Sequence, residues 1–250
     1  MKKLALVASF LAISAVSASA ADMAARPYTK APPVMVEPGY NWSGFYLGGQ
    51  AGGAWLRANE GFINDAGNLD PLTFDSSSSF IGGGHAGLQG QWGTWVLGVE
   101  GTYNWTNLHE TVPSINPGFP RVRSLNIDDT ASVVGKVGYT GGPWLLYVKG
   151  GWADLRINTT SLLPPTGLSS SSGNNWHSGW TVGGGLDYQF SRNWIGGIDG
   201  NYYRANFNGV QTFSNGQFGS VVNSKAEVYS VTARLSYLFN WGNAPVAARY

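Results

Sequence analysis

WVLGVEGTYNW, at residues 95–105, places its side chains in two alternating series. One series is apolar and has tryptophan at both ends, Trp95 and Trp105, while the other carries Glu100. Alternation with a period of two predicts a β-strand, because successive side chains of a strand point to opposite faces. An apolar face of this length, with aromatic rings at both ends, is typical of a tilted strand that crosses a bilayer. The stretch therefore predicts a transmembrane β-strand.

Seven further segments show the same alternation, and the spacing between segments is regular. The eight predicted strands cover residues 44–56, 79–92, 95–105, 129–139, 144–157, 178–190, 194–204 and 226–241. Tight turns at 93–94, 140–143 and 191–193 alternate with long stretches near 57–78, 106–128, 158–177 and 205–225. Outer-membrane barrels have short periplasmic turns and long extracellular loops. We therefore predict an all-β fold, an eight-stranded antiparallel up-and-down transmembrane β-barrel with both termini in the periplasm.

The start of the chain carries an export signal. Lys2 and Lys3 precede a short apolar run that ends in small residues, which predicts signal-peptide cleavage between Ala20 and Ala21. An uncleaved anchor is the alternative, but the run is shorter than the ~20 residues that a spanning helix needs. The predicted organisation is a signal peptide at 1–20, a Pro-rich periplasmic leader at 21–43, the barrel at 44–241 and a short tail at 242–250. Export without a transmembrane helix predicts an integral protein of the outer membrane in a Gram-negative cell envelope.

The composition fits a wall that faces lipid. Charged residues make up 12% of the chain, against about 25% in a typical soluble domain. Without Lys2 and Lys3, 13 of the 15 basic residues remain against 14 acidic ones, so nucleic acid is not an expected partner. The chain has no cysteine, and its three histidines do not have metal-ligand spacing, so no cofactor or metal is expected.

The predicted register creates two belts of aromatic side chains at the membrane interfaces. The candidates for the periplasmic belt are Trp92, Trp95, Trp144, Trp194 and Phe239, together with Tyr139 and Tyr188. The candidates for the outer belt are Trp55, Trp105, Trp152 and Trp180, together with Tyr202. The alternative is that these tryptophans fill the core of a soluble sandwich, but such a core would use shorter strands of Val, Ile and Leu.

Six charged residues have the opposite parity and are expected to point into the barrel as one layer. They are Glu100, Lys136, Lys149, Asp187, Asp199 and Arg234. Pairing of neighbouring strands gives three candidate ion pairs, Glu100–Lys136, Lys149–Asp187 and Asp199–Arg234. Because an eight-stranded barrel is about filled by its own side chains, we expect these paired charges to plug the interior. A proton or ion path through the buried ionisable groups is the alternative.

No catalytic constellation emerges from the sequence. His177 with Ser178 and His109 with Glu110 are the nearest candidates for a catalytic base and its partner. Sequence neighbours on a strand point to opposite faces, so neither pair forms a nucleophile with its base. We therefore do not expect an enzyme.

The stretch NWSGFYLGG at residues 41–49 resembles the opening of a porin-like family of alphaproteobacterial outer-membrane proteins, which is related to the barrel of outer membrane protein A. The segments VEG, VGY, YVKGG, GWTVGGG and YLFNWG, which begin at residues 99, 137, 147, 179 and 237, continue this resemblance over residues 40–250. It implies an abundant structural barrel, often labelled porin without a demonstrated pore. The chain departs from the family pattern at Lys136, where arginine is more common, and at Asp187 and Asp199, where glutamate is.

The resemblance also implies that the barrel-assembly machinery is a partner and reads the aromatic last strand. Phe239 and Tyr250 are both candidates for the terminal residue of that signal. The other expected partners are outer-membrane lipid and lipopolysaccharide.

Three functions are compatible with this barrel. The first is a structural barrel that supports envelope integrity and displays four long extracellular loops. The second is a small porin for ions or small solutes, which the balanced interior charges disfavour. The third is an adhesin or a receptor for a small ligand that acts through its loops, where binding function commonly lies. The composition of the loops does not separate the first function from the third.

Overall fold

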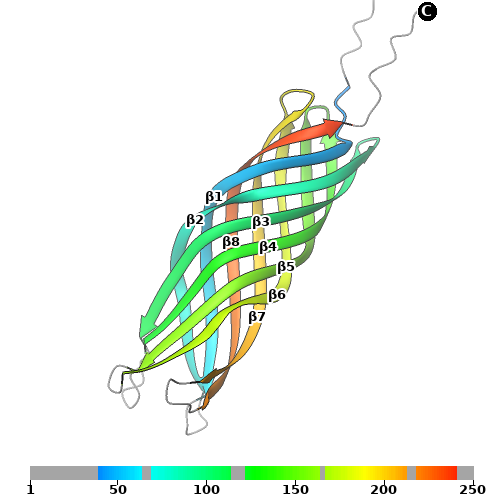
Figure 1. Cartoon of the computed structure of the whole chain (residues 1–250). Helices are drawn as coiled ribbons and strands as arrows, with labels where there is room; N and C mark the ends of the chain where they lie inside the picture. Colours follow the sequence, from blue (N-terminus) through cyan, green and yellow to red (C-terminus); the bar gives the residue numbers. More distant parts are fainter. Residues whose placement is uncertain (1–38, 64–68, 114–121, 164–166, 213–217, 241–250) are drawn as a thin grey trace, which may run out of the picture. The chain divides into compact units, whose positions relative to one another are not determined.

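The computed structural model describes residues 39–63, 69–113, 122–163, 167–212 and 218–240. Eight antiparallel strands in chain order form one closed barrel, in which β1 pairs with both β2 and β8 (Figure 1). The strands are β1 (Gly44–Ile63), β2 (Leu69–Trp92), β3 (Trp95–Pro113), β4 (Val122–Gly141), β5 (Trp144–Leu163), β6 (Leu168–Gln189), β7 (Trp194–Thr212) and β8 (Phe218–Asn240). The predicted fold class and strand count are thus confirmed.

The three predicted tight turns all lie at one end of the barrel. Gly93 and Gly142 provide the positive φ angles, +62° and +70°, that tight hairpin turns require and that glycine adopts without strain. Gly44 and Asn240, the first residue of β1 and the last of β8, pair with each other at this same end. We call it the turn end, and the opposite end the loop end.

Several predicted segments fall outside the described residues. They are the signal peptide with its cleavage site between Ala20 and Ala21, most of the leader, Trp241 and the tail with Tyr250. Within the described residues, no helix has the length and the hydropathy needed to cross a membrane.

The prediction of long loops is wrong, because the strands continue through most of the segments that were predicted as loops. The strands contain 19 to 24 residues each, and β1, for example, ends at Ile63 instead of near Leu56. Backbone hydrogen bonds do not depend on side-chain hydrophobicity, so a Ser- and Asn-rich segment can extend an existing ladder. The connections that remain at the loop end are 64–68, 114–121, 164–167 and 213–217.

Near the loop end the barrel divides into two sheets. The pairing of β2 with β3 stops at Ile81 and Thr106, and that of β6 with β7 stops at Gly179 and Ala205, although all four strands continue. The other six pairings run on toward the loop end. This half therefore consists of two four-stranded sheets, β7-β8-β1-β2 and β3-β4-β5-β6, whose loop ends form two separate groups in Figure 1. We call this part the double sheet.

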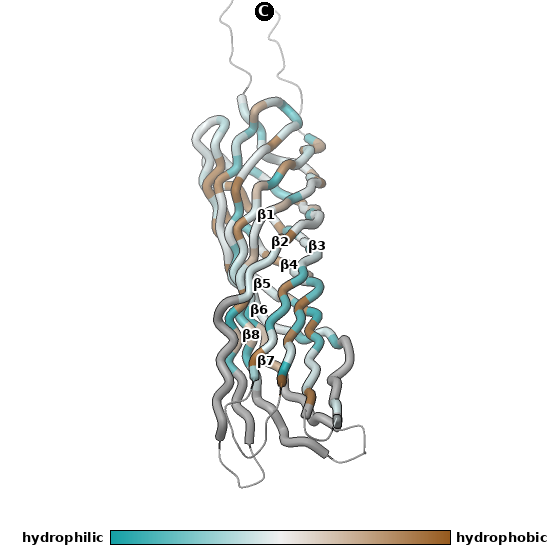
Figure 2. The backbone as a smooth tube through the Cα atoms, turned by 90° about the vertical axis from the view of Figure 1, so that its left-hand side faces the viewer, coloured by the Kyte–Doolittle hydropathy of each residue, from teal (hydrophilic) through white to brown (hydrophobic). Residues whose placement is uncertain are grey.

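The hydrophobic alternation reverses where the double sheet begins. In the turn-end half the outward side chains are apolar, as at Leu97 and Val99, and Glu100 points inward. In the double sheet most of the buried inward side chains are apolar and most of the outward ones are polar. The adjacent pair Trp55-Leu56 marks the change, since Trp55 is exposed outside and Leu56 is buried inside. Figure 2 shows the alternation of hydrophobic and hydrophilic residues along the strands. The turn-end half is thus built to face lipid and the double sheet to face water.

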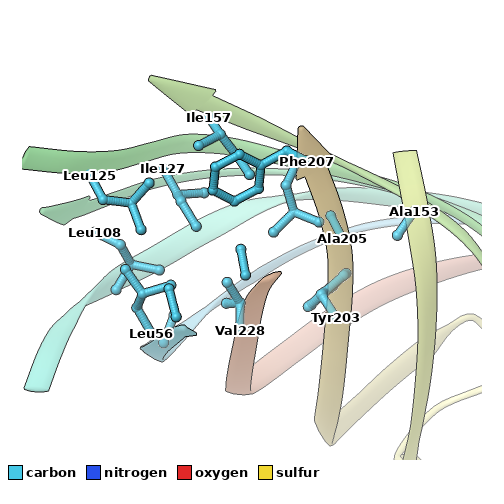
Figure 3. Close-up of a cluster of buried hydrophobic side chains, with 14 of the residues drawn as sticks. Leu56, Leu108, Leu125, Ile127, Ala153, Ile157, Tyr203, Ala205, Phe207 and Val228 are labelled. Atoms are coloured by element: carbon cyan, nitrogen blue, oxygen red, sulfur yellow. The ribbon is translucent and has the colours of Figure 1, made fainter. Parts of the chain in front are cut away.

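The buried side chains of the double sheet form a hydrophobic core between its two sheets (Figure 3). One sheet contributes Ala54, Leu56, Ala58, Ile81, Tyr203, Ala205, Phe207, Ala226 and Val228. The other contributes Leu108, Leu125, Ile127, Ala153, Leu155 and Ile157. The arrangement corresponds to a small β-sandwich that continues from the barrel wall.

All nine predicted interface aromatics lie on the outside of the barrel. Trp92, Trp95, Trp144, Trp194 and Phe239 surround the turn end, and Trp55, Trp105, Trp152 and Trp180 lie near the middle of their strands. We call these groups the turn-end belt and the middle belt. Ten residue steps separate Trp95 from Trp105, which at about 3.3 Å per residue and a tilt of about 40° corresponds to roughly 25 Å. That is the height of the apolar band of an outer-membrane barrel.

Two leucines of β5 test whether the double sheet is held by a packed core. Leu155 is fully buried in this core, whereas Leu162 is 42% exposed. Leu155→Ala should lower the free energy of unfolding by about 2–5 kcal/mol, because it leaves a cavity. Leu162→Ala should change it by less than about 1 kcal/mol. Tryptophan fluorescence during denaturant unfolding in detergent micelles measures both, and equal effects would contradict the packed core.

Candidate functional site

The six predicted inward charges gather inside the barrel, between the two aromatic belts. One comes from each of strands β3 to β8, and all are at most 6% exposed. They are Glu100, Lys136, Lys149, Asp187, Asp199 and Arg234, which we call the charge layer. With three acids and three bases, the charge layer is neutral as a whole.

Arg234 contacts all three acids of the charge layer. Its Nη2 lies 2.6 Å from Oε2 of Glu100, its Nη1 lies 3.5 Å from Oδ2 of Asp199, and its Nε lies 3.8 Å from Oδ1 of Asp187. Lys149 Nζ contacts Glu100 at 3.0 Å and Asp199 at 2.9 Å. Lys136 Nζ contacts Asp187 at 3.1 Å. Each acid therefore has two basic partners, and the contacts form one connected network.

Of the three predicted ion pairs, the structure contains Asp199–Arg234 and has different partners for the other charges. The two lysines, Lys136 and Lys149, lie directly opposite each other in the β4–β5 ladder. Each turns to an acid on a different strand: Lys136 reaches Asp187 on β6, and Lys149 reaches Glu100 on β3. The prediction considered only neighbouring strands, but in a barrel this narrow a long side chain also reaches strands further around the wall.

Two buried tyrosines that the sequence analysis missed complete the charge layer. The Tyr46 hydroxyl donates a hydrogen bond to Glu100 at 2.9 Å, and the Tyr147 hydroxyl donates one to Asp199 at 2.7 Å. Lys136 Nζ lies 3.9 Å from the centre of the Tyr147 ring, within the range of a cation–π contact. The sequence did carry a signal for the inward position of Tyr147. It precedes the inward Lys149 by two residues, so both side chains point to the same face of the strand.

Two inward glycines make room for these rings. A Cβ atom at Gly87 would lie 2.5 Å from the Tyr46 ring, and one at Gly185 would lie 2.5 Å from the Tyr147 hydroxyl. Such distances are well inside van der Waals contact, so no other residue fits without moving the tyrosine. The glycines of the GWTVGGG segment thus include one that shapes the charge layer.

A cluster of buried apolar side chains lies inside the barrel at its turn end. It consists of Trp42, Tyr46, Val96, Leu145, Tyr147, Ile195 and Leu238. Trp42, which the sequence analysis placed in the leader, is fully buried. Its backbone N–H donates to Gln91 Oε1 at 3.0 Å, and its carbonyl accepts from Gln89 Nε2 at 2.7 Å. We call this cluster the Trp42 plug.

A polar zone connects the charge layer to the core of the double sheet. Gln50 Nε2 donates to Asn104 Oδ1 at 2.7 Å, and Asn104 Nδ2 donates to Thr130 Oγ1 at 3.2 Å. His85 lies at this side of the charge layer, with Nε2 2.7 Å from Ser236 Oγ. From the turn end to the loop end, the interior thus passes through an apolar plug, the charge layer, a polar zone and an apolar core.

The remaining histidines lie on strand extensions and not in the predicted loops. The His177 ring packs 5.4 Å from the Phe207 ring, and His109 Nδ1 contacts Asn126 Oδ1. In the part of the chain that the structure describes, no group of three or more His, Asp or Glu residues could hold a metal ion.

Removal of Arg234 should destabilise the barrel, because three acids then face two bases. The expected loss in the free energy of unfolding for Arg234→Ala is on the order of 3–5 kcal/mol, the cost of breaking a buried ion pair. A second substitution, Glu100→Gln, should restore part of that loss, since Glu100 makes the shortest contact with Arg234. Denaturant unfolding in micelles gives the three values.

Arg192→Ala is the matched control for this experiment, because Arg192 is exposed in the turn before β7 and should tolerate the same change. An Arg234→Ala variant as stable as Arg192→Ala would mean that the charge layer does not hold the barrel together.

Comparison with known proteins places the chain among bacterial outer-membrane barrels. The "Outer membrane protein beta-barrel domain" family matches residues 8–212. The 25 kDa outer-membrane immunogenic protein of Brucella abortus is 26% identical over 241 residues, which cover 96% of this chain and 99% of the relative. Its counterpart from Brucella ovis is 28% identical over 204 residues, which cover 81% of this chain and 89% of the relative.

Two solved structures are similar to this chain. The outer membrane protease OmpT of Escherichia coli has a TM-score of 0.48 and 11% identity, and the match covers 78% of this chain and 97% of OmpT. The outer membrane protein OprG of Pseudomonas aeruginosa has a TM-score of 0.48 and 13% identity, with 80% and 99% covered.

The family match and the Brucella relatives confirm the resemblance to alphaproteobacterial outer-membrane barrels. In such barrels the short turns lie in the periplasm and the opposite end faces the outside of the cell. The chain belongs to the outer membrane protein β-barrel domain family and is a transmembrane β-barrel of the Gram-negative outer membrane.

Proposed function

We propose that this protein is a structural barrel of the outer membrane, closed along its axis, that supports envelope integrity and holds a rigid double sheet outside the cell. The observation that carries this proposal is that buried side chains occupy the interior in four successive zones. Four zones follow one another along the barrel axis: the Trp42 plug, the charge layer, the polar zone and the apolar core.

The energetics of these zones oppose the passage of ions. To pass the charge layer, an ion would have to separate Arg234 from Glu100, and breaking a buried pair costs on the order of 3–5 kcal/mol. In the core of the double sheet, an ion would lose its hydration among side chains such as Leu108 and Leu155 with nothing to replace it. These two barriers lie in series, which favours a closed barrel over a pore.

The double sheet suits display better than the predicted long loops do. β1 continues eight residues beyond Trp55, which at about 3.3 Å per residue and a tilt of about 40° extends roughly 20 Å above the middle belt. Its core fixes the outward polar surface in one shape. The Brucella relatives are named immunogenic outer-membrane proteins, and a rigid surface outside the cell is accessible to antibodies.

A conductance measurement distinguishes the structural barrel from the alternative of a small pore. The refolded mature chain in planar bilayers should give no stable single-channel steps, because buried side chains occupy each zone of the interior. A trimeric porin in the same bilayers is the positive control. Large and stable currents from the wild-type chain would contradict the closed barrel and favour the small porin.

A deletion strain tests the role in the envelope. Loss of the gene should increase sensitivity to detergent and to large antibiotics that the outer membrane normally excludes, and expression of the wild-type chain should restore resistance. Unchanged sensitivity together with a loss of attachment to surfaces would contradict the structural role and favour the adhesin.

A further inference from the structure

The double sheet has two seams, where β2 separates from β3 and where β6 separates from β7. At the β2–β3 seam, side chains bridge the two strand edges. Thr106 Oγ1 donates to the Phe80 carbonyl at 3.1 Å, and Ser77 Oγ donates to the His109 carbonyl at 2.9 Å. Hydroxyl groups of this seam thus occupy backbone acceptors that a neighbouring strand would otherwise bind.

The β6–β7 seam is held in a different way. The His177 ring packs against the Phe207 ring at 5.4 Å, just beyond the last ladder pair, Gly179 and Ala205. The side chains that the structure describes on these two edges are those of residues 175–178, 206 and 207, and none of them forms a hydrogen bond across the seam. An aromatic contact therefore seals the inner side of this seam, while the backbone edges lack side-chain partners in this described part.

The sequences of the two seams differ in the same direction. Charged residues and proline are the usual means by which proteins block the edge of a sheet against a further strand. The unpaired parts of β2 and β3 contain five such residues, which are Asp70, Pro71, Asp75, Glu110 and Pro113. The unpaired part of β6 reads LSSSSGNNWHS at residues 168–178, and that of β7 reads NFNGVQT at residues 206–212. Neither contains an acid, a lysine, an arginine or a proline, so the β6–β7 seam is the unblocked one.

We call residues 168–178 of β6 the β6 edge. One side of it pairs with β5 as far as Leu163 and Leu168, so its backbone is extended and in register. Every second residue of such a strand directs its N–H and C=O groups away from β5, toward the seam. Trp176 is exposed, but its ring lies 6.4 Å from that of Tyr103 on β3, and therefore leans over its own sheet and away from the seam. The β6 edge thus presents the pattern of donors and acceptors that another extended chain matches.

An acid lies beside the β6 edge. Asp154 is directly opposite Ser178 in the β5–β6 ladder, and its Oδ1 has no hydrogen-bond partner. An added strand would lie two strand spacings from β5, roughly 10 Å. A lysine or arginine side chain on that strand and the Asp154 side chain can span this distance together, because Ser178 between them is small. His177 adds no opposing charge, since burial lowers the pKa of its imidazole and keeps the ring neutral near pH 7.

We propose that the β6 edge binds an extended segment of another protein as an added β-strand, with a basic residue of that segment facing Asp154. The backbone groups of the edge supply the affinity, and Asp154 selects a segment with lysine or arginine over a neutral or acidic one. The inference goes beyond the proposed function, from which it takes only the position of the double sheet outside the cell.

A model peptide tests this site. The probe is the acetylated and amidated peptide TVTKTVT with a fluorescent label, and fluorescence anisotropy measures its binding to the mature chain in phosphatidylcholine nanodiscs. It should bind these nanodiscs and not empty ones. Hydrogen exchange followed by mass spectrometry should then show slower exchange of the amides at residues 168–178 and no change at residues 69–80. The same peptide with N-methyl groups on alternate residues should not bind, because it lacks the donors that pair with a strand edge.

Two serine substitutions form a matched pair. Ser178→Lys places a charge on the β6 edge and beside Asp154, and should weaken binding of the peptide at least about tenfold. Ser78→Lys makes the same change at an exposed position of β2, beside the other seam, and should leave binding unchanged. Asp154→Asn should weaken binding about two- to fivefold, the range of a cross-strand charge pair. It should not affect the peptide TVTQTVT, in which glutamine replaces the lysine.

Four results would overturn the proposal. They are no binding to the wild-type chain, equal binding of the N-methylated peptide, equal weakening by Ser78→Lys and Ser178→Lys, and a dimer whose β6 edge is already protected from exchange without peptide. The last result would assign the edge to a second copy of this chain. Circular dichroism establishes that the variants are folded, and the N-methylated peptide tests the edge on the wild-type chain alone. Peptide binding does not depend on conductance, so an open barrel would contradict the proposed function and leave this inference standing.

Discussion

A bilayer provides no hydrogen-bond partner for a peptide group, and the rest of this structure depends on that constraint. Every N–H and C=O in the wall must pair with a neighbouring strand, so the sheet has no free edge and β1 closes onto β8. Closure with eight strands leaves an interior about as wide as two facing side chains. An inward charge therefore needs other inward side chains as partners, and the charge layer with its two tyrosines meets this need.

The same constraint explains where the closed barrel ends and the two separate sheets begin. Beyond the middle belt the wall is surrounded by water, which can satisfy a peptide group at a strand edge. There the β2–β3 and β6–β7 ladders end, and side chains bridge one seam instead, as when Ser77 Oγ donates to the His109 carbonyl at 2.9 Å. At the same level, the hydrophobic side chains change from the outer face of the wall to the inner face. Solvent thus determines both the closure of the ladder and the direction of the apolar face.

The charge layer combines strong attraction with a large cost of desolvation. Each acid has two basic partners, and Glu100 and Asp199 also accept hydrogen bonds from Tyr46 and Tyr147. A buried polar network of this kind stabilises a structure only when all its members are satisfied, so each member depends on the others. This mutual dependence favours one fixed arrangement, in keeping with a structural role, and makes the network a poor path for mobile ions.

The sequence by itself determined the strands, the tight turns, the belts and the identity of the inward charges, because side-chain parity and turn chemistry are local properties. Only the tertiary structure decided which charges pair, since Lys136 and Lys149 reach acids on strands that sequence neighbourhood does not indicate. It also decided that Trp42 belongs to the barrel and that the strands extend through segments predicted as loops. These features depend on the width of the closed barrel and on ladders that continue regardless of side-chain type. Both arise only when all eight strands are assembled, so no single segment of the sequence encodes them.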